Sequence, residues 1–158
     1  MPANKIKTRA ELAELVREKK SSGKIIGFTN GCFDILHLGH VRYLTEAKQK
    51  CDILVVGVND DASVGRLKGS SRPFNDQQAR IEVLAALECV DLLTFFTEDT
   101  PEALIRDLAP DILFKGGDWK IKDIAGAGHV TERGGRVEVM PYVGGYSTTD
   151  LVKRIKED

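Results

Sequence analysis

The sequence predicts an α/β fold in which five parallel strands form a doubly wound sheet with helices on both faces. Short apolar runs alternate with segments of helical period along the whole chain. The run at residues 53–58 is continuously apolar, as expected of a strand covered on both faces. No linker or second compositional region interrupts the pattern, so we expect one domain over residues 1–158. Residues 1–23 are expected to form an N-terminal helix that leads into the sheet.

The first half of the chain supplies two of the expected strands and two helices. Thr8 is a suitable N-cap for a helix that Gly23 ends. Residues 24–29 form the first expected strand. A helix with one apolar stripe follows at residues 38–50, and residues 53–58 are the second strand.

The second half continues the alternation and completes a Rossmann-like sheet. Asn75 and Gln78 resemble a capping box for a helix that runs to about Glu88. Pro101 suits the first turn of another helix, which ends near Pro110. The remaining expected elements are strands at 92–96, 112–115 and 136–140 and helices at 123–133 and 147–155.

Polar and glycine-rich segments follow three of the expected strands. These segments are residues 30–40, 116–118 and 143–145. In open parallel sheets, ligands bind at the carboxyl ends of the strands, near the point where the strand order reverses. We therefore expect the three segments to meet at one edge of the sheet and to form the binding site.

Composition excludes several classes of protein. The 24 acidic residues nearly balance the 23 basic residues, which argues against nucleic-acid binding and against a polybasic membrane anchor. There is no apolar run of the ~20 residues that cross a bilayer, and the N-terminus lacks a signal peptide's apolar core. We therefore expect a cytoplasmic, soluble protein. The 3 cysteines are far apart in sequence, which predicts reduced thiols without a disulfide framework or zinc site.

The histidines His37 and His40 are the strongest chemical signal. They are spaced i and i+3 across a predicted helix start, so they share one face. Gly39 between them leaves room for the close approach of a ligand. A helix N-terminus adds free N–H donors and a partial positive charge. The combination favours an anion site, and phosphate is the leading candidate.

A wider set of motifs resembles a known family. The segment Gly31-Cys32-Phe33-Asp34-x-x-His37-x-Gly39-His40 resembles the signature of the H-x-G-H nucleotidyltransferases, in their cytidylyltransferase-like branch. From about Lys24 to the C-terminus, later motifs occur in the order found in the adenylyltransferase domain of ADP-heptose synthases. These motifs are Arg66-Leu67-Lys68-Gly69, Ser71-Arg72-Pro73, Gln78-x-Arg80, Lys115-Gly116-Gly117-Asp118 and Gly145-Tyr146-Ser147-Thr148-Thr149.

The resemblance implies a role for each matching residue. The implied catalytic residues are His37, His40, Lys68 and Arg80. The implied nucleotide-binding residues are Gly31, Cys32, Phe33, Asp34, Gly39, Lys115, Gly116, Gly117, Asp118, Tyr146, Ser147, Thr148 and Thr149. Arg72 and Trp119 are implied to bind the second substrate, and Asp34 to help hold Mg²⁺ or to orient a basic residue.

Several of these residues also have a purely structural interpretation. Ser147 and Asp150 fit a capping box for the last helix. Asp34 could cap the helix that follows it, and Arg80 could form a surface salt bridge. The composition around Lys68 and Arg72 predicts a solvated loop, whereas the resemblance implies a mobile basic loop that closes over a triphosphate.

The resemblance implies an adenylyltransferase that joins AMP from ATP to D-glycero-β-D-manno-heptose 1-phosphate for lipopolysaccharide core biosynthesis, with Mg²⁺. It also implies a homo-oligomer and a separate sugar kinase. One alternative is a glycerol-3-phosphate cytidylyltransferase, which Asp118-Trp119 fits. The lack of an arginine between Pro141 and Tyr146 speaks against it. A nucleotide-binding regulator without turnover is a third interpretation.

Overall fold

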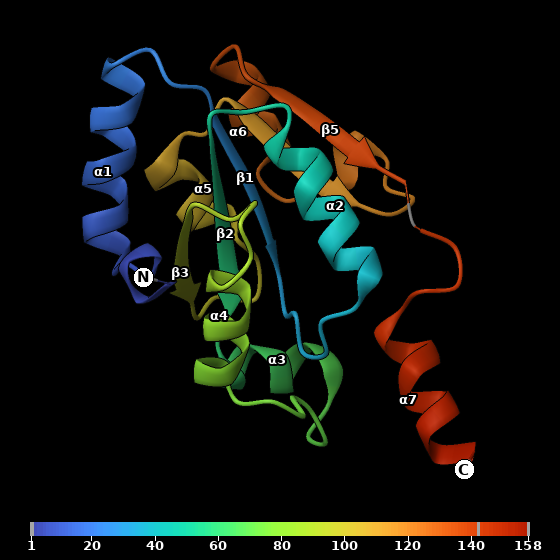
Figure 1. Cartoon of the computed structure of the whole chain (residues 1–158). Helices are drawn as coiled ribbons and strands as arrows, with labels where there is room; N and C mark the ends of the chain where they lie inside the picture. Colours follow the sequence, from blue (N-terminus) through green and yellow to red (C-terminus); the bar gives the residue numbers. More distant parts are fainter. Residues whose placement is uncertain (1, 142, 158) are drawn as a thin grey trace.

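Five parallel strands form one sheet in a computed structural model that describes residues 2–141 and 143–157 (Figure 1). The strand order is β3-β2-β1-β4-β5, so the chain reverses its direction of growth between β1 and β4. This is the predicted doubly wound topology. The strands are β1 (Ile26–Gly31), β2 (Ile53–Asn59), β3 (Leu92–Phe96), β4 (Ile112–Gly116) and β5 (Arg136–Met140).

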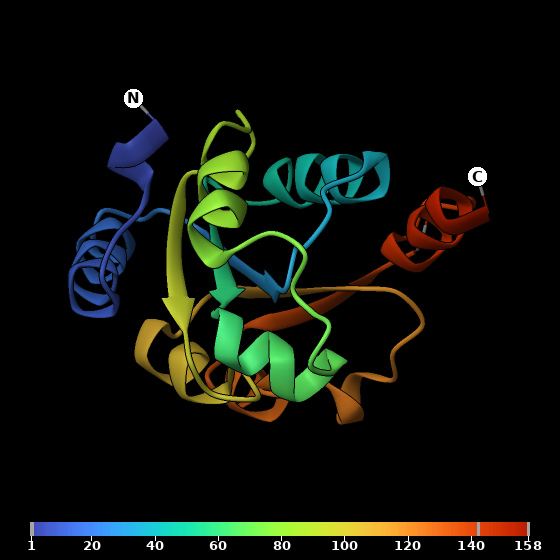
Figure 2. The ribbon, with the colours of Figure 1, turned by 90° about the horizontal axis from the view of Figure 1, so that it is seen from below.

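Helices cover both faces of the sheet (Figures 1 and 2). Apolar side chains of α1, α5 and α6 pack on one face, and those of α2 and α4 pack on the other. The helices are η1 (Pro2–Lys5), α1 (Arg9–Ser21), α2 (Leu38–Lys48), α3 (Asp61–Lys68), α4 (Gln77–Ala85), α5 (Glu102–Leu108), η2 (Ile121–Asp123), α6 (Ala127–Glu132) and α7 (Thr148–Glu157).

Two buried phenylalanines show how the core is filled on either side of the sheet. Phe28 belongs to the core under α1 and α5, and Phe114 to the core under α2 and α4. Both neighbour a glycine in an adjacent strand. A Cβ atom on Gly57 would lie 3.0 Å from Phe28, and one on Gly27 would lie 2.7 Å from Phe114. The glycines therefore make room for the aromatic rings.

Helix α3 corrects the expectation that Lys68 lies in a solvated loop. Asp60 caps this helix, because its side chain accepts a hydrogen bond from the Ser63 N–H at 2.8 Å. With 8 residues, including Gly65, the segment is too short to show a clear helical period. Lys68 is its last residue, and a loop begins only at Gly69. Lys68 is therefore held at the end of a helix, and the loop that carries Arg72 begins after it.

Other expected boundaries also shift by a few residues. The N-cap of α4 is Asp76, which accepts from the Ala79 N–H at 2.8 Å, so the expected capping box at Asn75 is wrong by one position. The helix expected at residues 123–133 is limited to α6. Gly126 precedes α6 with φ 83°, a left-handed conformation that helices do not continue through. The predicted Thr8 cap of α1 is confirmed, with Glu11 completing a capping box.

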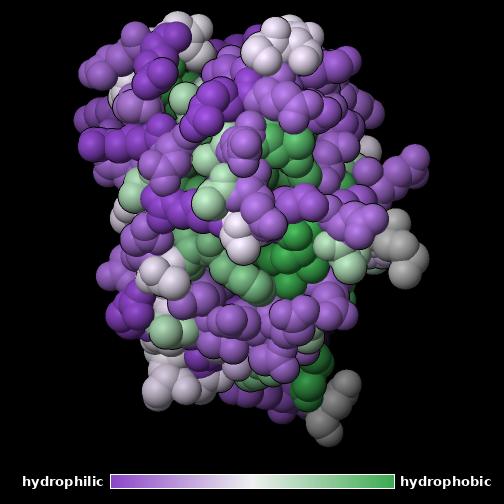
Figure 3. Space-filling model, turned by 90° about the vertical axis from the view of Figure 1, so that its left-hand side faces the viewer, coloured by the Kyte–Doolittle hydropathy of each residue, from purple (hydrophilic) through white to green (hydrophobic). Residues whose placement is uncertain are grey.

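The N-terminal segment protects the β3 edge of the sheet. Ile6 forms a bridge with Leu93, and the Lys7 N–H donates to the Leu93 carbonyl at 2.9 Å. On the side of the molecule next to α1 and β3, hydrophilic side chains cover most of the surface, with apolar groups between them (Figure 3). Within the described residues, no helix has both the length and the apolar character that crossing a membrane requires.

Candidate active site

A cleft runs along the carboxyl edge of the sheet, above the point where the strand order reverses. It consists of a large cavity of about 610 Å³ and a small cavity of about 330 Å³. The large cavity extends towards the ends of β2 and β3, and the small cavity lies between α2 and the start of α7. Both cavities are lined by Asn30, Gly31, Cys32, Phe33, His40, Lys68, Lys115, Thr148 and Thr149.

The two histidines stack on each other at the start of α2. Their ring centroids are 3.8 Å apart, and the ring planes differ by 27°. His37 is the residue before α2, and its backbone N–H donates to Nδ1 of His40 at 3.3 Å. Because Nδ1 of His40 accepts this hydrogen bond, a neutral His40 carries its proton on Nε2. His40 can therefore donate a hydrogen bond to an anionic oxygen in the cleft.

Burial controls the charge of this pair. It lowers the pKa of His37, and it lowers the pKa of His40 to about 4 with help from the neighbouring His37. Both imidazoles are therefore neutral at pH 7 in the free protein. Nδ1 of His37 is buried and has no hydrogen-bond partner among the described residues. A buried nitrogen without a partner indicates a site where a polar group of a ligand can form a hydrogen bond.

Gly39 has a more specific role than the sequence suggested. A Cβ atom on residue 39 would lie 3.0 Å from both Cε1 and Nδ1 of His37. The His37 imidazole therefore occupies the space that a side chain at position 39 would need. Gly31 acts similarly for Phe33, whose ring would lie 3.0 Å from an added Cβ atom. Phe33 itself has φ 48°, a left-handed conformation that is strained for a bulky residue.

Lysines supply positive charge where the two cavities meet. Lys68 is exposed at the end of α3, and Lys115 is half-buried at the end of β4. Burial lowers the pKa of Lys115, and the charge of Lys68 lowers it further. The ammonium group of Lys115 lies 4.8 Å from the ring centroid of Trp119, a cation–π contact. This cluster is suited to binding several negative charges together.

Cys32 does not have the environment of a reactive thiol. Burial raises the pKa of its side chain, so the thiolate is disfavoured at neutral pH. Its Sγ lies 3.9 Å from Oδ1 of Asn59. The residue contributes to the lining of both cavities without acting as a nucleophile.

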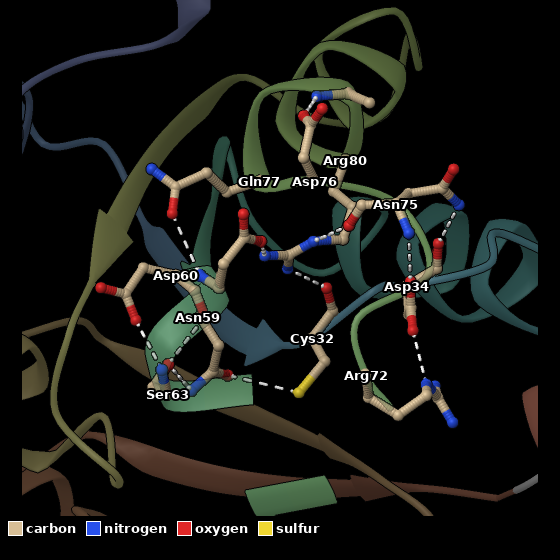
Figure 4. A network of polar contacts seen from close by, with 12 residues as sticks. Cys32, Asp34, Asn59, Asp60, Ser63, Arg72, Asn75, Asp76, Gln77 and Arg80 are labelled. Carbon is tan, nitrogen blue, oxygen red and sulfur yellow. Dashed lines mark hydrogen bonds and ion pairs between the residues drawn. The ribbon is translucent and has the colours of Figure 1, made fainter. Parts of the chain in front are cut away.

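The Asp34 carboxylate forms its hydrogen bonds with other residues of the protein. Its carboxylate accepts hydrogen bonds from Nε of Arg72 at 2.6 Å, from the Phe74 N–H at 2.8 Å and from the Asn75 N–H at 2.9 Å (Figure 4). These contacts do not fit the expected role as a Mg²⁺ ligand, because three donors already surround the carboxylate. Asp34 is also not the N-cap of α2, because His37 occupies that position. No group of three His, Cys, Asp or Glu side chains in the described part of the chain could hold a metal ion.

Arg80 lies elsewhere than expected. Its side chain is 0% exposed and does not line either cavity. The guanidinium donates from Nε to the Asn75 carbonyl at 3.1 Å, from Nη1 to the Cys32 carbonyl at 2.5 Å and from Nη2 to Asp61 at 2.8 Å (Figure 4). Helix α4 therefore presents Arg80 to the protein interior, and the surface salt bridge is also excluded. Arg80 joins the β1–α2 loop to α3 and to the loop before α4.

The C-terminal motif lines the small cavity. Tyr146, Ser147, Thr148 and Thr149 all contribute to it. Ser147 also accepts a hydrogen bond from the Asp150 N–H at 3.0 Å, so the expected cap of α7 exists together with the cavity lining.

The glycine-rich motif after β4 is only partly in the cleft. Gly116 lines the small cavity, and Trp119 lines the large one. Gly117 and Asp118 line neither. Gly117 forms a turn with φ 105°, in which its N–H donates to the Met140 carbonyl at 2.8 Å.

Sequence reasoning missed several residues of the large cavity. Asn59 ends β2, and Asp99 and Thr100 follow β3. Asn59 could have been found by extending the rule about carboxyl strand ends to the second strand. Asp99 lies in a loop whose position depends on tertiary contacts, including the ion pair with Arg66 at 2.7 Å.

Comparisons with known proteins agree with this geometry. A model of the cytidylyltransferase-like family matches residues 28–154, which include most of β1, all of β2 to β5 and the residues that line the cleft. The chain therefore belongs to the cytidylyltransferase-like family. The prediction of a nucleotidyltransferase enzyme is confirmed at the level of this class.

Individual relatives narrow the comparison. The chain is 51% identical, over 98% of its length, to the bifunctional protein HldE of Pelobacter propionicus. It is 57% identical, over 85% of its length, to the bifunctional protein HldE of Nitrobacter hamburgensis. The chain spans only 32% and 28% of the length of these two proteins.

Solved structures share the fold. A lipopolysaccharide core biosynthesis protein from Thermoplasma volcanium aligns with a TM-score of 0.61 and 31% identity, covering 77% of this chain and 98% of that protein. The pantoate-beta-alanine ligase of Francisella tularensis aligns over 97% of this chain and 78% of its own, with a TM-score of 0.62 and 16% identity. The second likeness concerns the fold alone.

Proposed function

We propose that this domain transfers AMP from ATP to D-glycero-β-D-manno-heptose 1-phosphate, giving ADP-heptose and pyrophosphate. The observation that carries the proposal is the meeting of two cavities at a stacked histidine pair and a lysine cluster. Two phosphate-bearing substrates can meet there. The names of the HldE relatives and of the similar lipopolysaccharide core biosynthesis protein support the choice of substrate.

The residues proposed for the two substrates line different cavities. Among the residues proposed for nucleotide binding, Gly39, Gly116, Tyr146 and Ser147 line only the small cavity. Arg72 and Trp119, proposed for the second substrate, line only the large cavity. We therefore place the nucleoside in the small cavity, the sugar in the large cavity and the reacting phosphates between them.

The reaction needs no covalent intermediate. A phosphate monoester has a second pKa of about 6, so the sugar 1-phosphate is largely a dianion at pH 7 without a general base. One of its oxygens forms a bond to the α-phosphorus of ATP. The bond from that phosphorus to the bridging oxygen breaks, and pyrophosphate leaves with the electron pair. The protein contributes positioning and charge stabilisation, as in other phosphoryl transfers.

Each cationic or donor group has a proposed place in this step. His40 donates from Nε2 to a phosphate oxygen as negative charge moves to the leaving group. His37, Lys68, Lys115 and the free N–H groups at the start of α2 bind the same phosphate chain. We propose that ATP is used as its Mg²⁺ complex, in which the cation would neutralise phosphate charge. Asp34 is not assigned to it.

Two alternatives make different predictions for the same assay. The Asp118-Trp119 pair favours a glycerol-3-phosphate cytidylyltransferase. A nucleotide-binding regulator would use the same cleft without turnover. The complete set of His37, His40, Lys68 and the Ser-Thr-Thr segment around the cleft speaks against the regulator.

Pyrophosphate release distinguishes the three. The protein is mixed with Mg²⁺, each nucleoside triphosphate in turn and each candidate phosphate. Release with ATP and heptose 1-phosphate is the expected result. Release with CTP and glycerol 3-phosphate would establish the cytidylyltransferase instead, and nucleotide binding without release would establish the regulator.

The proposal also concerns the setting of the enzyme. We propose that a sugar kinase acts in the pathway that supplies the heptose 1-phosphate, and that the reaction takes place in the cytoplasm. We further propose a homo-oligomer, by analogy with relatives. Light scattering after gel filtration measures the mass of the particle, and a mass of 17.4 kDa would show a monomer.

A further inference from the structure

Only the Nε edge of the Arg72 guanidinium forms a hydrogen bond with the described part of the protein. Its Nε donates to Oδ2 of Asp34 at 2.6 Å, and its Cζ lies 4.7 Å from the ring centroid of Phe74. Within residues 2–141 and 143–157, the terminal nitrogens Nη1 and Nη2 have no hydrogen-bond partner. The residue lines the large cavity, and its side chain is 19% exposed. The guanidinium is therefore oriented by the protein while two nitrogens stay available to a ligand.

Asp34 is the group that fixes this orientation. Its side chain is 1% exposed, and its Oδ1 accepts from the N–H groups of Phe74 and Asn75 at 2.8 Å and 2.9 Å. The Asn75 side chain donates back to the Asp34 carbonyl at 2.6 Å. Burial alone would raise the pKa of Asp34, but these N–H groups and the Arg72 guanidinium lower it overall. Asp34 is therefore a buried anion that ties the β1–α2 loop to the loop carrying Arg72 (Figure 4).

We propose that Asp34 is a positioning residue, which holds Arg72 so that its two terminal nitrogens bind the phosphate of the acceptor in the large cavity. A guanidinium with a fixed Nε can present its remaining edge as a two-pronged donor, which matches two oxygens of one phosphate. The identity of the acceptor rests on the function proposed above. The orientation of Arg72 does not depend on it.

Asp34→Asn is the sharpest variant, because only Oδ2 accepts from Arg72 and only Oδ1 accepts from the Asn75 N–H, while the Phe74 N–H donates to both oxygens, at 2.8 Å to Oδ1 and 3.0 Å to Oδ2. The asparagine Oδ1 can keep the hydrogen bonds to the N–H groups of Phe74 and Asn75. The asparagine Nδ2 then faces Nε of Arg72, donor against donor, in place of Oδ2. The substitution therefore releases Arg72 while keeping the loop attached.

The matched control is Asp107→Asn. Asp107 accepts from Nε of Arg9 at the same distance, 2.6 Å, but lies on α5 and lines neither cavity. Both substitutions remove one arginine–carboxylate pair. Thermal unfolding of each variant shows whether it is folded.

Steady-state kinetics with ATP and heptose 1-phosphate give the first test. We expect Asp34→Asn to raise the KM for heptose 1-phosphate by about 10- to 100-fold, the effect of losing one hydrogen bond to a charged group. The KM for ATP and the Mg²⁺ requirement should stay unchanged. Arg72→Ala should raise the same KM, and Asp34→Asn should add less than about twofold in the Arg72→Ala background. Asp107→Asn should match the wild type.

Three outcomes would overturn the proposal. A raised Mg²⁺ requirement in Asp34→Asn would make Asp34 a metal ligand. An equal effect of Asp34→Asn with and without Arg72 would make its role purely structural. Wild-type values in a folded Asp34→Asn would show that Arg72 needs no such support.

Inorganic phosphate separates this proposal from the proposed function. If the wild type shows no turnover with heptose 1-phosphate, the proposed function fails, and a phosphate titration followed by the NMR signal of the ¹⁵N-labelled Arg72 Nε–H still tests Asp34. We expect the dissociation constant for phosphate to rise about tenfold in Asp34→Asn. A constant equal to that of the wild type would overturn the proposal.

Discussion

Neutral histidines at the start of α2 determine what the cleft can do at the residue scale. His40 has its Nδ1 occupied and its Nε2 free to donate, and burial keeps the ring uncharged in the free protein. A neutral donor beside lysines stabilises developing charge on a phosphate without transferring a proton. Cys32 is not an activated nucleophile, since burial raises the pKa of its thiol.

His40→Ala removes the donor that the proposed mechanism requires. We expect kcat to fall on the order of 10²–10³-fold, by analogy with the loss of one oxyanion donor. Pyrophosphate release at saturating substrates measures it. Turnover near that of the wild type would show that His40 does not act on the phosphates.

Gly39→Ala should separate activity from stability. The added methyl group lies 3.0 Å from the His37 ring and must displace it, so we expect turnover to fall at least tenfold. Stability should not fall with it, because alanine is the better helix former by up to about 1 kcal/mol. Gly128→Ala in α6 is the matched control, since nothing lies within 4 Å of its added Cβ atom. Unchanged turnover in Gly39→Ala would contradict the assigned role of this glycine.

The pKa of His40 predicts a dependence of stability on pH. The folded value of about 4 lies below the 6.5 of an unfolded histidine, so between these values the unfolded chain binds more protons. Stability should therefore fall as the pH falls from 6.5 to 4, by at most about 1.4 kcal/mol per pH unit from this residue. Urea unfolding of His40→Asn should show a shallower dependence. An equal slope in the variant would contradict the assignment.

At the scale of elements, Arg80 joins three segments that build the cleft. Its guanidinium binds the β1–α2 loop through Cys32, the start of α3 through Asp61 and the loop before α4 through Asn75. The sequence match indicated that Arg80 mattered but not where it pointed. A residue early in a helix can face the core when a loop folds over it, and no periodicity reports that loop.

Arg80→Met tests this supporting role. We expect a loss of stability of about 2 to 4 kcal/mol, because the variant leaves two carbonyl groups without their donor, whereas water can solvate Asp61, whose side chain is 40% exposed. Urea unfolding measures it. Arg106→Ala, which breaks an exposed pair with Glu102, should cost less than about 1 kcal/mol. If Arg80→Met were as stable as the wild type and only its KM for ATP were raised, Arg80 would be a phosphate-binding residue and the supporting role would be wrong.

The elements also show how far the sequence could predict the structure. Strand β5 and the cap of α1 follow from local residues and agree with the structure. Helix α3 was missed because its stability comes from the Asp60 cap and from contacts such as the Arg66–Asp99 pair. The position of His37 and His40 on one face was predictable from spacing. Their stacking and shared hydrogen bond depend on the backbone before α2 and were not predictable.

For the whole molecule, the alternation of strands and helices was enough to predict the sheet and the edge at which the motifs meet. The order β3-β2-β1-β4-β5 places that edge at the reversal point, where both cavities open. The division into two cavities could not be predicted, because it depends on α3, on the loop after β3 and on α7. This arrangement supports our central claim, that the cleft brings two phosphates together for direct transfer.

The stereochemical course at the α-phosphorus tests that claim most directly. The enzyme is given (Sp)-ATPαS and heptose 1-phosphate, and the configuration of the sugar-nucleotide product is determined by ³¹P NMR. Direct in-line attack predicts inversion at phosphorus. Retention of configuration would show two successive displacements through a covalent enzyme intermediate and would contradict the account.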